Sequence, residues 1–191
     1  LSHRLKHCNA LADSMSNASP TQLQQLKTQL AEQMGNPVGL HTMGIPAAIS
    51  TLGVIVSFTI PQLWLGYGVL AALGQPVERV FVWVVLVALL FAGINGVTMF
   101  MIGKGSMRAV RIHLALAVIS LVLTAIYLLA ALSGSPFPGV SLTAALVSIA
   151  MLLLSGSAIL STVFYKMLLF TLHNRAWRKL IRQTRDAHMP R

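Results

Sequence analysis

The sequence predicts an all-α membrane protein with four transmembrane helices, and three observations support that prediction. Hydrophobic residues make up 55% of the 191 residues and charged residues only 9%, whereas about a quarter of an ordinary soluble domain is charged. No charged side chain occurs in three long stretches, 33–77, 80–103 and 112–165. A cluster rich in proline and glycine at 133–139 divides the last stretch and predicts a turn.

Two other fold classes fit these stretches poorly. A soluble helical core is disfavoured because uncharged runs of this length leave no polar face for water. A transmembrane β-barrel is disfavoured because the apolar runs are continuous, whereas barrel strands alternate between apolar and polar residues. We therefore expect a helical bundle that crosses the bilayer.

The spans follow from the length of each uncharged stretch, since a hydrocarbon core needs about 20 apolar residues per helix. We predict spans at about 45–73, 80–103, 110–132 and 141–165. Around them we divide the chain into an N-terminal segment at 1–40, a four-helix transmembrane bundle at 41–172 and a basic tail at 173–191.

The orientation follows from the basic residues, because loops on the cytoplasmic side carry the excess of lysine and arginine. One side of the predicted bundle receives the basic residues before the first span, between the second and third, and after the fourth, among them Arg4, Lys6, Lys27, Lys104, Arg108, Arg111, Arg175, Arg178, Lys179, Arg182, Arg185 and Arg191. The other side receives only Arg79, beside Glu78. We expect both termini in the cytoplasm of a bacterium and the spans in its inner membrane. No cleavable signal peptide is visible, so we expect the first span to act as the insertion signal.

The N-terminal segment is expected to form a short helical hairpin. Apolar residues recur along one face of the first helix at Leu1, Leu5, Cys8, Ala12 and Met15, and along the second at Leu23, Leu26, Leu30 and Met34. Ser19, Pro20 and Gln22 form a capping-box pattern that begins the second helix, and Gly35-Asn36-Pro37 ends it. Two narrow stripes make no independent core, so they must pack on each other, on the membrane surface or on a partner chain.

The tail is expected to continue the fourth helix as a basic amphipathic helix. Such a helix beside a span binds anionic lipid. We assign lipid-headgroup contacts to five cations, Lys166, Arg175, Arg178, Lys179 and Arg182. Nucleic acid is not expected as a partner, because the tail is short and has one aromatic residue, Trp177.

Polar and small residues within the spans are the candidates for binding and helix packing. Pro61 removes a backbone donor and leaves the Ser57 carbonyl without its helical partner, so we expect a kink. The candidate set comprises Pro61, Gln62, Ala92, Asn95, Gly96, Ser155, Ser157, Ser161 and Thr162. Small residues allow close helix approach, and amides and hydroxyls bond between helices. Two alternatives stay open: a transporter site at the broken first span, and a groove lined by water or lipid.

Catalytic and metal chemistry are not predicted. The chain has four acidic residues, none of them in a span, and one cysteine, so paired-carboxylate catalysis and a cysteine-based metal cluster are disfavoured. His41, His113 and His173 fall near span ends, but none belongs to a ligand-spaced pair on one helix, so we expect no metal, haem or other cofactor.

The functional hypothesis is a non-enzymatic inner-membrane protein that acts through helix contacts in the bilayer, with membrane lipids and a homo-oligomer or larger membrane complex as partners. It would serve as a subunit of a membrane complex or as an immunity, exclusion or defence protein. The alternative is an oligomeric channel or small transporter whose path is lined by the span kinked at Pro61. A redox or haem enzyme is a third and weaker class.

Overall fold

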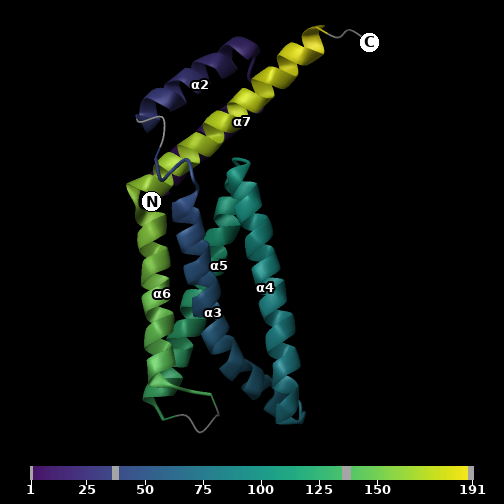
Figure 1. The fold of residues 1–191 in the computed structure, drawn as a ribbon, viewed down its shortest axis with the longest axis vertical. Coiled ribbons are helices and arrows are strands. Elements are labelled where there is room, and N and C mark those ends of the chain that lie inside the picture. Colours follow the sequence, from purple (N-terminus) through teal and green to yellow (C-terminus); the bar gives the residue numbers. More distant parts are fainter. Residues whose placement is uncertain (1, 36–38, 135–138, 189–191) are drawn as a thin grey trace. The chain divides into compact units, whose positions relative to one another are not determined.

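The computed structural model describes residues 2–35, 39–134 and 139–188, and in that part of the chain it contains seven α-helices (Figure 1). They are α1 (Ser2–Ser14), α2 (Pro20–Met34), α3 (Ile45–Ala72), α4 (Val80–Gly103), α5 (Met107–Leu132), α6 (Leu142–Leu160) and α7 (Thr162–His188), with a 3-10 turn, η1 (Val77–Arg79), before α4. Helices α3 to α6 are long and apolar enough to cross a membrane, which confirms the prediction of four candidate spans. Of the sequence predictions, Leu1, Asn36, Pro37, the middle of the 133–139 turn and Arg191 lie outside the described residues.

The chain forms two compact units. Unit 1 comprises Leu1–Ala48, Met99–Val110 and Ala158–Arg191. Unit 2 comprises Ile49–Thr98 and Arg111–Ser157.

Within unit 2, α3 lies against both α5 and α6. Near the start of α3, the Ser50 hydroxyl lies 2.7 Å from Nε2 of His113 on α5 and 3.1 Å from the hydroxyl of Ser155 on α6. Two turns further along α3, the carbonyl of Ser57 accepts a hydrogen bond from Ser148 on α6. The contacts move toward the start of α6 as α3 proceeds, so these two helices are antiparallel.

Helix α4 also packs against α3, through a pair of aromatic rings and a close approach at a glycine. The Phe58 and Phe91 rings are stacked with their centroids 3.7 Å apart. Gly66 lies so close to the Trp83 indole that a Cβ there would be 2.4 Å from Cδ1. Since Phe58 precedes Gly66 while its partner Phe91 follows Trp83, α3 and α4 are antiparallel.

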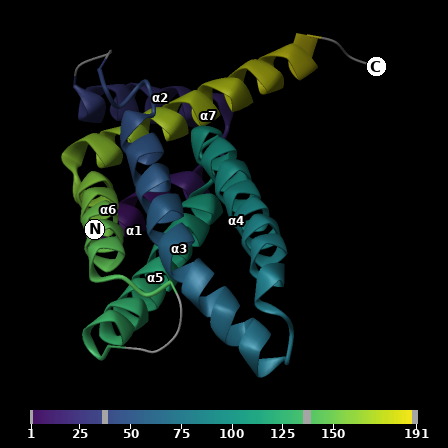
Figure 2. The same ribbon diagram turned by 60° about the horizontal axis from the view of Figure 1, so that its bottom comes forward.

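The bend in α3 is visible partway along the helix (Figure 2). Pro61 is the proline inside this helix. It is buried, and proline both removes a backbone donor and clashes with the carbonyl four residues earlier. The kink expected from the sequence is therefore present.

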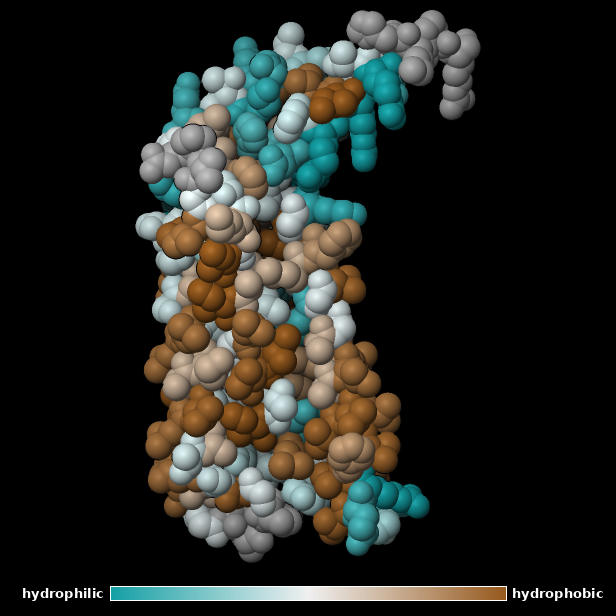
Figure 3. All heavy atoms as spheres, in the orientation of Figure 1, coloured by the Kyte–Doolittle hydropathy of each residue, from teal (hydrophilic) through white to brown (hydrophobic). Residues whose placement is uncertain are grey.

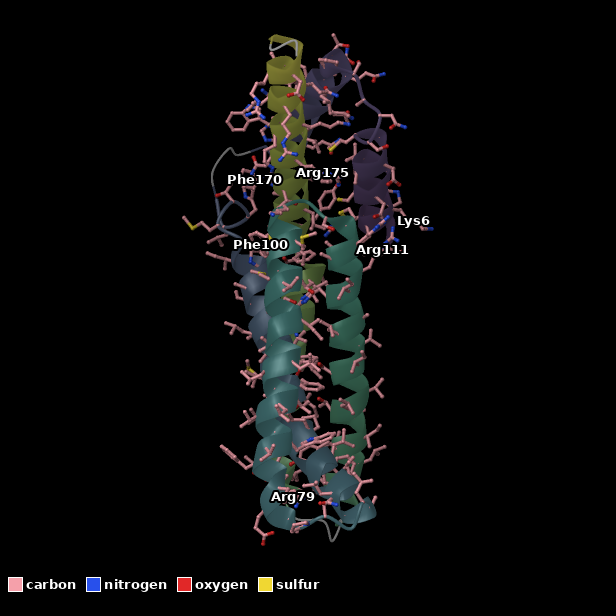
Figure 4. All side chains as sticks on the ribbon, turned by 90° about the vertical axis from the view of Figure 1, so that its right-hand side faces the viewer. Lys6, Arg79, Phe100, Arg111, Phe170 and Arg175 are labelled. Carbon is pink, nitrogen blue, oxygen red and sulfur yellow. The ribbon has the colours of Figure 1, made fainter. Side chains whose placement is uncertain are left out.

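The lateral surface of α3, α4 and α6 is largely hydrophobic in the face shown by Figure 3, whereas α2 and α7 carry many hydrophilic side chains. Unit 2 contains only three charged residues in its sequence, Glu78, Arg79 and Arg111. Arg79 and Arg111 lie at opposite ends of this unit (Figure 4). This distribution matches a segment whose middle is surrounded by lipid.

The fourth span ends earlier than the sequence suggested, and the tail is not its continuation. Helix α6 stops at Leu160, and α7 begins at Thr162. The Ser161 hydroxyl accepts a hydrogen bond from the Phe164 amide (3.0 Å), as an N-cap residue does. Arg4 donates to the carbonyl of Leu160 (3.4 Å) at the end of α6. Both contacts satisfy backbone groups that a helix end leaves free.

In unit 1, the hairpin packs on α7: both α1 and α2 contact that helix. The apolar stripe of α1 is buried at Cys8, Ala12 and Met15, and that of α2 at Leu23, Leu30 and Met34. The expected capping box is formed, because the Ser19 hydroxyl accepts from the Gln22 amide while the Gln22 side chain accepts from the Ser19 amide. The stripes therefore pack on α7 of the same chain, a surface that the sequence analysis did not name.

Candidate functional site

A row of buried hydroxyl groups joins α3, α5 and α6 in the interior of unit 2. We call it the hydroxyl seam; it comprises Ser50, Ser57, Ser120, Thr124, Ser148 and Ser155. All six are at most 2% exposed. Each makes hydrogen bonds to carbonyl or hydroxyl groups, which is how polar side chains stabilise helix packing where no water is present.

The carbonyl that Pro61 leaves without a helical partner is bonded by the seam. The Ser148 hydroxyl donates to the Ser57 carbonyl at 2.9 Å. The Thr124 hydroxyl lies 2.8 Å from that of Ser148 and 3.4 Å from the same carbonyl oxygen. The proline therefore releases an acceptor on α3 that α5 and α6 then use, because a buried carbonyl without a partner is costly in an apolar interior.

A double-mutant cycle tests this link. Ser148→Ala should destabilise the protein by about 1–2 kcal/mol, since it leaves the Ser57 carbonyl with a weaker donor. In a Pro61→Ala background the cost should shrink, because residue 61 then has an amide that can donate to that carbonyl. Unfolding by increasing sodium dodecyl sulfate in mixed micelles measures both costs.

The matched control for this cycle is Ser157→Ala. Ser157 is exposed on the same helix and donates within α6, to the Leu154 carbonyl (2.8 Å). We expect it to change the stability by less than about 0.5 kcal/mol. An equal cost of Ser148→Ala with and without Pro61 would refute the proposed coupling.

His113 is a buried residue that the sequence did not single out as part of the polar interior. It is 1% exposed, and its Nε2 lies 2.7 Å from the Ser50 hydroxyl. The sequence placed it at a span end, but its partner Ser50 lies 63 residues away in the chain. The serine spacing of seven on α3 (Ser50 and Ser57) and on α6 (Ser148 and Ser155) was the available signal, and it could not show which residue of α5 would complete the contact.

Two buried polar side chains, Gln62 on α3 and Asn95 on α4, and the buried indole nitrogen of Trp83 carry unpaired polar atoms in these two helices. Gln62 is 1% exposed, and neither its Oε1 nor its Nε2 has a hydrogen-bond partner among the described residues. It lies one helical turn from both Phe58 and Gly66, the residues that contact α4. The indole nitrogen of Trp83 is also without a partner within the described chain.

Asn95 extends this set toward the other end of α4. It is 1% exposed, and its Nδ2 donates to the Phe91 carbonyl at 2.9 Å. Its Oδ1 is buried without a partner in the described residues. Buried polar groups are nearly always paired. Among the described residues of unit 2, the unpaired atoms of Gln62, Trp83 and Asn95 are therefore the ones best suited to form a hydrogen bond with an additional molecule.

The other predicted packing residues lie in different surroundings. Ala92 and Gly96 are exposed on α4, and nothing lies within 4 Å of where a Cβ of Gly96 would be. Ser155 belongs to the hydroxyl seam and lies close to Gly53. Thr162 is exposed at the start of α7, after the capping residue Ser161.

Three of the predicted headgroup residues bind carbonyl groups at helix ends. Arg175 donates to Gly105 (3.1 Å) and Arg178 to Lys104 (3.1 Å), just after α4. Lys179 donates to Met15 and Ser16, just after α1, at 2.6 Å each. A cation is favourable at a helix C-terminus because the free carbonyls carry partial negative charge. The sequence missed this role because these partners are 70 or more residues distant.

The three histidines considered from the sequence are divided between the units. His41, which is 5% exposed and makes an edge contact with Phe170 (centroids 6.3 Å), and His173 belong to unit 1. His113 belongs to unit 2. Among the residues that the structure describes, no group of three histidine, cysteine or acidic side chains is arranged to hold a metal ion.

Comparison with known proteins gives no relative for this chain. No protein-family model, no curated protein and no solved structure matches it.

Proposed function

We propose that this chain is a non-enzymatic protein of a bacterial inner membrane that acts by binding other membrane helices, as a subunit of a membrane complex or as an immunity, exclusion or defence protein. The exposed small-residue face of α4 carries the proposal. In the most apolar 18-residue stretch of this span, only 11% of the stretch is buried within the chain, whereas the corresponding share in the other three candidate spans is 22–33%. Helix α4 therefore has the most surface available for a partner.

The composition of the exposed face distinguishes a partner helix from lipid. Gly93 and Gly96 are exposed, and the space where each would have a Cβ is open to 4 Å. Exposed leucine and valine side chains pack as well against lipid chains as against another helix, so they do not favour a partner. Small residues do favour one, because they allow the backbone of another helix to approach closely. Ala92 adds a third small side chain to this stretch. We infer that a second copy of the chain, or another subunit, packs here.

The proposed topology places both chain termini in the cytoplasm. The Ser50 hydroxyl lies close to both His113 and Ser155, and α4 is antiparallel to α3. All four points at which the chain enters or leaves unit 2 are thus at one end of that unit. Basic residues flank these points, and the positive-inside rule favours the cytoplasm for them.

Substitution of Gly96 by leucine tests the contact. Gly96→Leu should dissociate an assembly held through α4, because the added side chain fills the space that the partner backbone would need. Native mass measurement in mild detergent should change from a multiple of 20.6 kDa to the single-chain value. The matched control is Ala150→Leu, an equally small and exposed position on α6, which should leave the mass unchanged.

Cysteine cross-linking provides an independent readout of the same contact. Gly96→Cys should form a dimer with a short bis-maleimide, whereas Ala150→Cys should not. The native Cys8 does not interfere, because burial raises its pKa to about 11 and the reactive thiolate is then scarce at neutral pH. A wild-type protein of single-chain mass, with no cross-link at position 96, would exclude a homo-oligomer built on α4.

A second candidate function, passage of a small polar solute or ion, is favoured by the unpaired groups between α3 and α4. Gln62, Trp83 and Asn95 offer donors and acceptors to a solute or to water, beside a kinked helix of the kind that lines transporter sites. Protein in liposomes should then conduct, and Gln62→Leu should reduce the flux at least several-fold. Thr59→Val, at an exposed position on the same helix, should not. The absence of flux for a panel of ions and small solutes would reject this function.

A further inference from the structure

A strongly basic pocket in unit 1 is independent of the α4 contact. Its volume is about 670 Å³, and its walls come from the end of α1, the turn between α4 and α5, and one side of α7. Five cations line it, Lys104, Arg175, Arg178, Lys179 and Arg182, together with the single carboxylate of Asp186. Arg175 projects from α7, as Figure 4 shows.

Carbonyl groups hold three of the five cations in place. Arg175, Arg178 and Lys179 are oriented by carbonyl groups at the ends of α4 and α1. A carbonyl dipole positions a cation but carries no net charge. Each guanidinium has five donor hydrogens and each ammonium three, so donors are left over for a ligand. Like charges gathered around one pocket repel each other, and a bound anion would relieve that repulsion.

The composition of the pocket identifies the class of anion. Arginine binds phosphate by two parallel hydrogen bonds, and lysine binds it as a point charge. A volume of about 670 Å³ is in the usual range of small-molecule sites, about 300–1,000 Å³, and exceeds what one phosphate group requires. We propose that this basic pocket binds a phosphate-bearing molecule with more than one negative charge, supplied either by an anionic lipid headgroup or by a soluble phosphorylated compound.

Titration of purified protein in a neutral detergent tests the site with two probes. Dioctanoyl phosphatidic acid carries a phosphate on a lipid, and inorganic pyrophosphate supplies the free anion. Dioctanoyl phosphatidylcholine is the zwitterionic control. Either anionic probe should raise the melting temperature in proportion to its occupancy, while the control should not. Binding of the lipid alone assigns the site to a headgroup, and binding of pyrophosphate, alone or together with the lipid, assigns it to the phosphate group itself.

The matched pair Arg182→Gln and Arg185→Gln locates the site. Arg182 lines the pocket and lies on the exposed side of α7, and Arg185 is exposed on the same helix but does not line the pocket. We expect Arg182→Gln to weaken binding by about three- to tenfold, as the loss of one charged hydrogen bond does. Arg185→Gln should have less than about a twofold effect. No binding of either anionic probe, or equal weakening by both variants, would overturn the proposal.

Discussion

Gly53→Ala should destabilise the protein by about 3 kcal/mol, because it inserts a methyl group into a contact that has no room for it. A Cβ at position 53 would lie 2.6 Å from the Met151 carbonyl oxygen and 2.8 Å from Cβ of Ser155. The first of these is a backbone atom, which cannot rotate away as a flexible side chain can. To make room, α3 and α6 must separate.

Separation would also lengthen hydrogen bonds of the hydroxyl seam near this point. The Ser155 hydroxyl donates to the Ser50 carbonyl at 3.0 Å, and bonds of this kind between membrane helices contribute about 0.6 kcal/mol on average. The free energy of unfolding in mixed micelles, from a sodium dodecyl sulfate titration, measures the combined effect. A lower melting temperature in mild detergent should accompany it.

Gly68→Ala is the control in the same helix, and it should have the opposite sign. Nothing lies within 4 Å of a Cβ at Gly68, and replacing a helical glycine with alanine stabilises a helix by about 0.5–1 kcal/mol. If both substitutions changed the stability in the same direction and by similar amounts, the close approach of α3 and α6 at Gly53 would be wrong.

Gly105→Ala should lower the free energy of unfolding of unit 1 by about 3 kcal/mol. Two separate physical costs contribute to this loss. Gly105 has a φ of +79°, which costs an L-residue about 1–2 kcal/mol. A Cβ there would also lie 2.8 Å from the Thr171 carbonyl oxygen and 3.3 Å from Cβ of Arg175, which adds about 1–2 kcal/mol of overpacking. The displaced turn would weaken the bond from Arg175 to the Gly105 carbonyl.

Gly134→Ala isolates the conformational part of that cost. Gly134 has a similar φ of +66° but has no atom within 4 Å of a Cβ, so it should lose only about 1–2 kcal/mol. Hydrogen exchange of the α7 amides should become faster in Gly105→Ala and stay unchanged in Gly134→Ala. Equal exchange in both variants would show that the turn does not pack on α7 as described.

The sequence by itself determined the number and placement of the four candidate spans, because that information is local. A helix in lipid must be long, apolar and free of charge, and each condition is written into consecutive residues. The capping box at Ser19 and Gln22 and the kink at Pro61 were predicted for the same reason: each depends on residues within one or two turns of a single helix. The one sizeable error concerned the end of the fourth span, which was predicted at about 165 but lies at Leu160. Ser161, which was interpreted as a packing residue, separates α6 from α7 and caps the start of α7.

Only the tertiary structure decided which polar groups meet, because those partners are far apart in the chain. The sequence predicted that Pro61 would free the Ser57 carbonyl, but it could not show that Ser148, 91 residues later, would donate to it. The cations of α7 illustrate the same limit: their composition indicated an anionic partner, while their positions are set by the carbonyl ends of α1 and α4. Hydrogen bonds between helices depend on their rotation and register, and four apolar helices of similar composition leave both undetermined until they are packed.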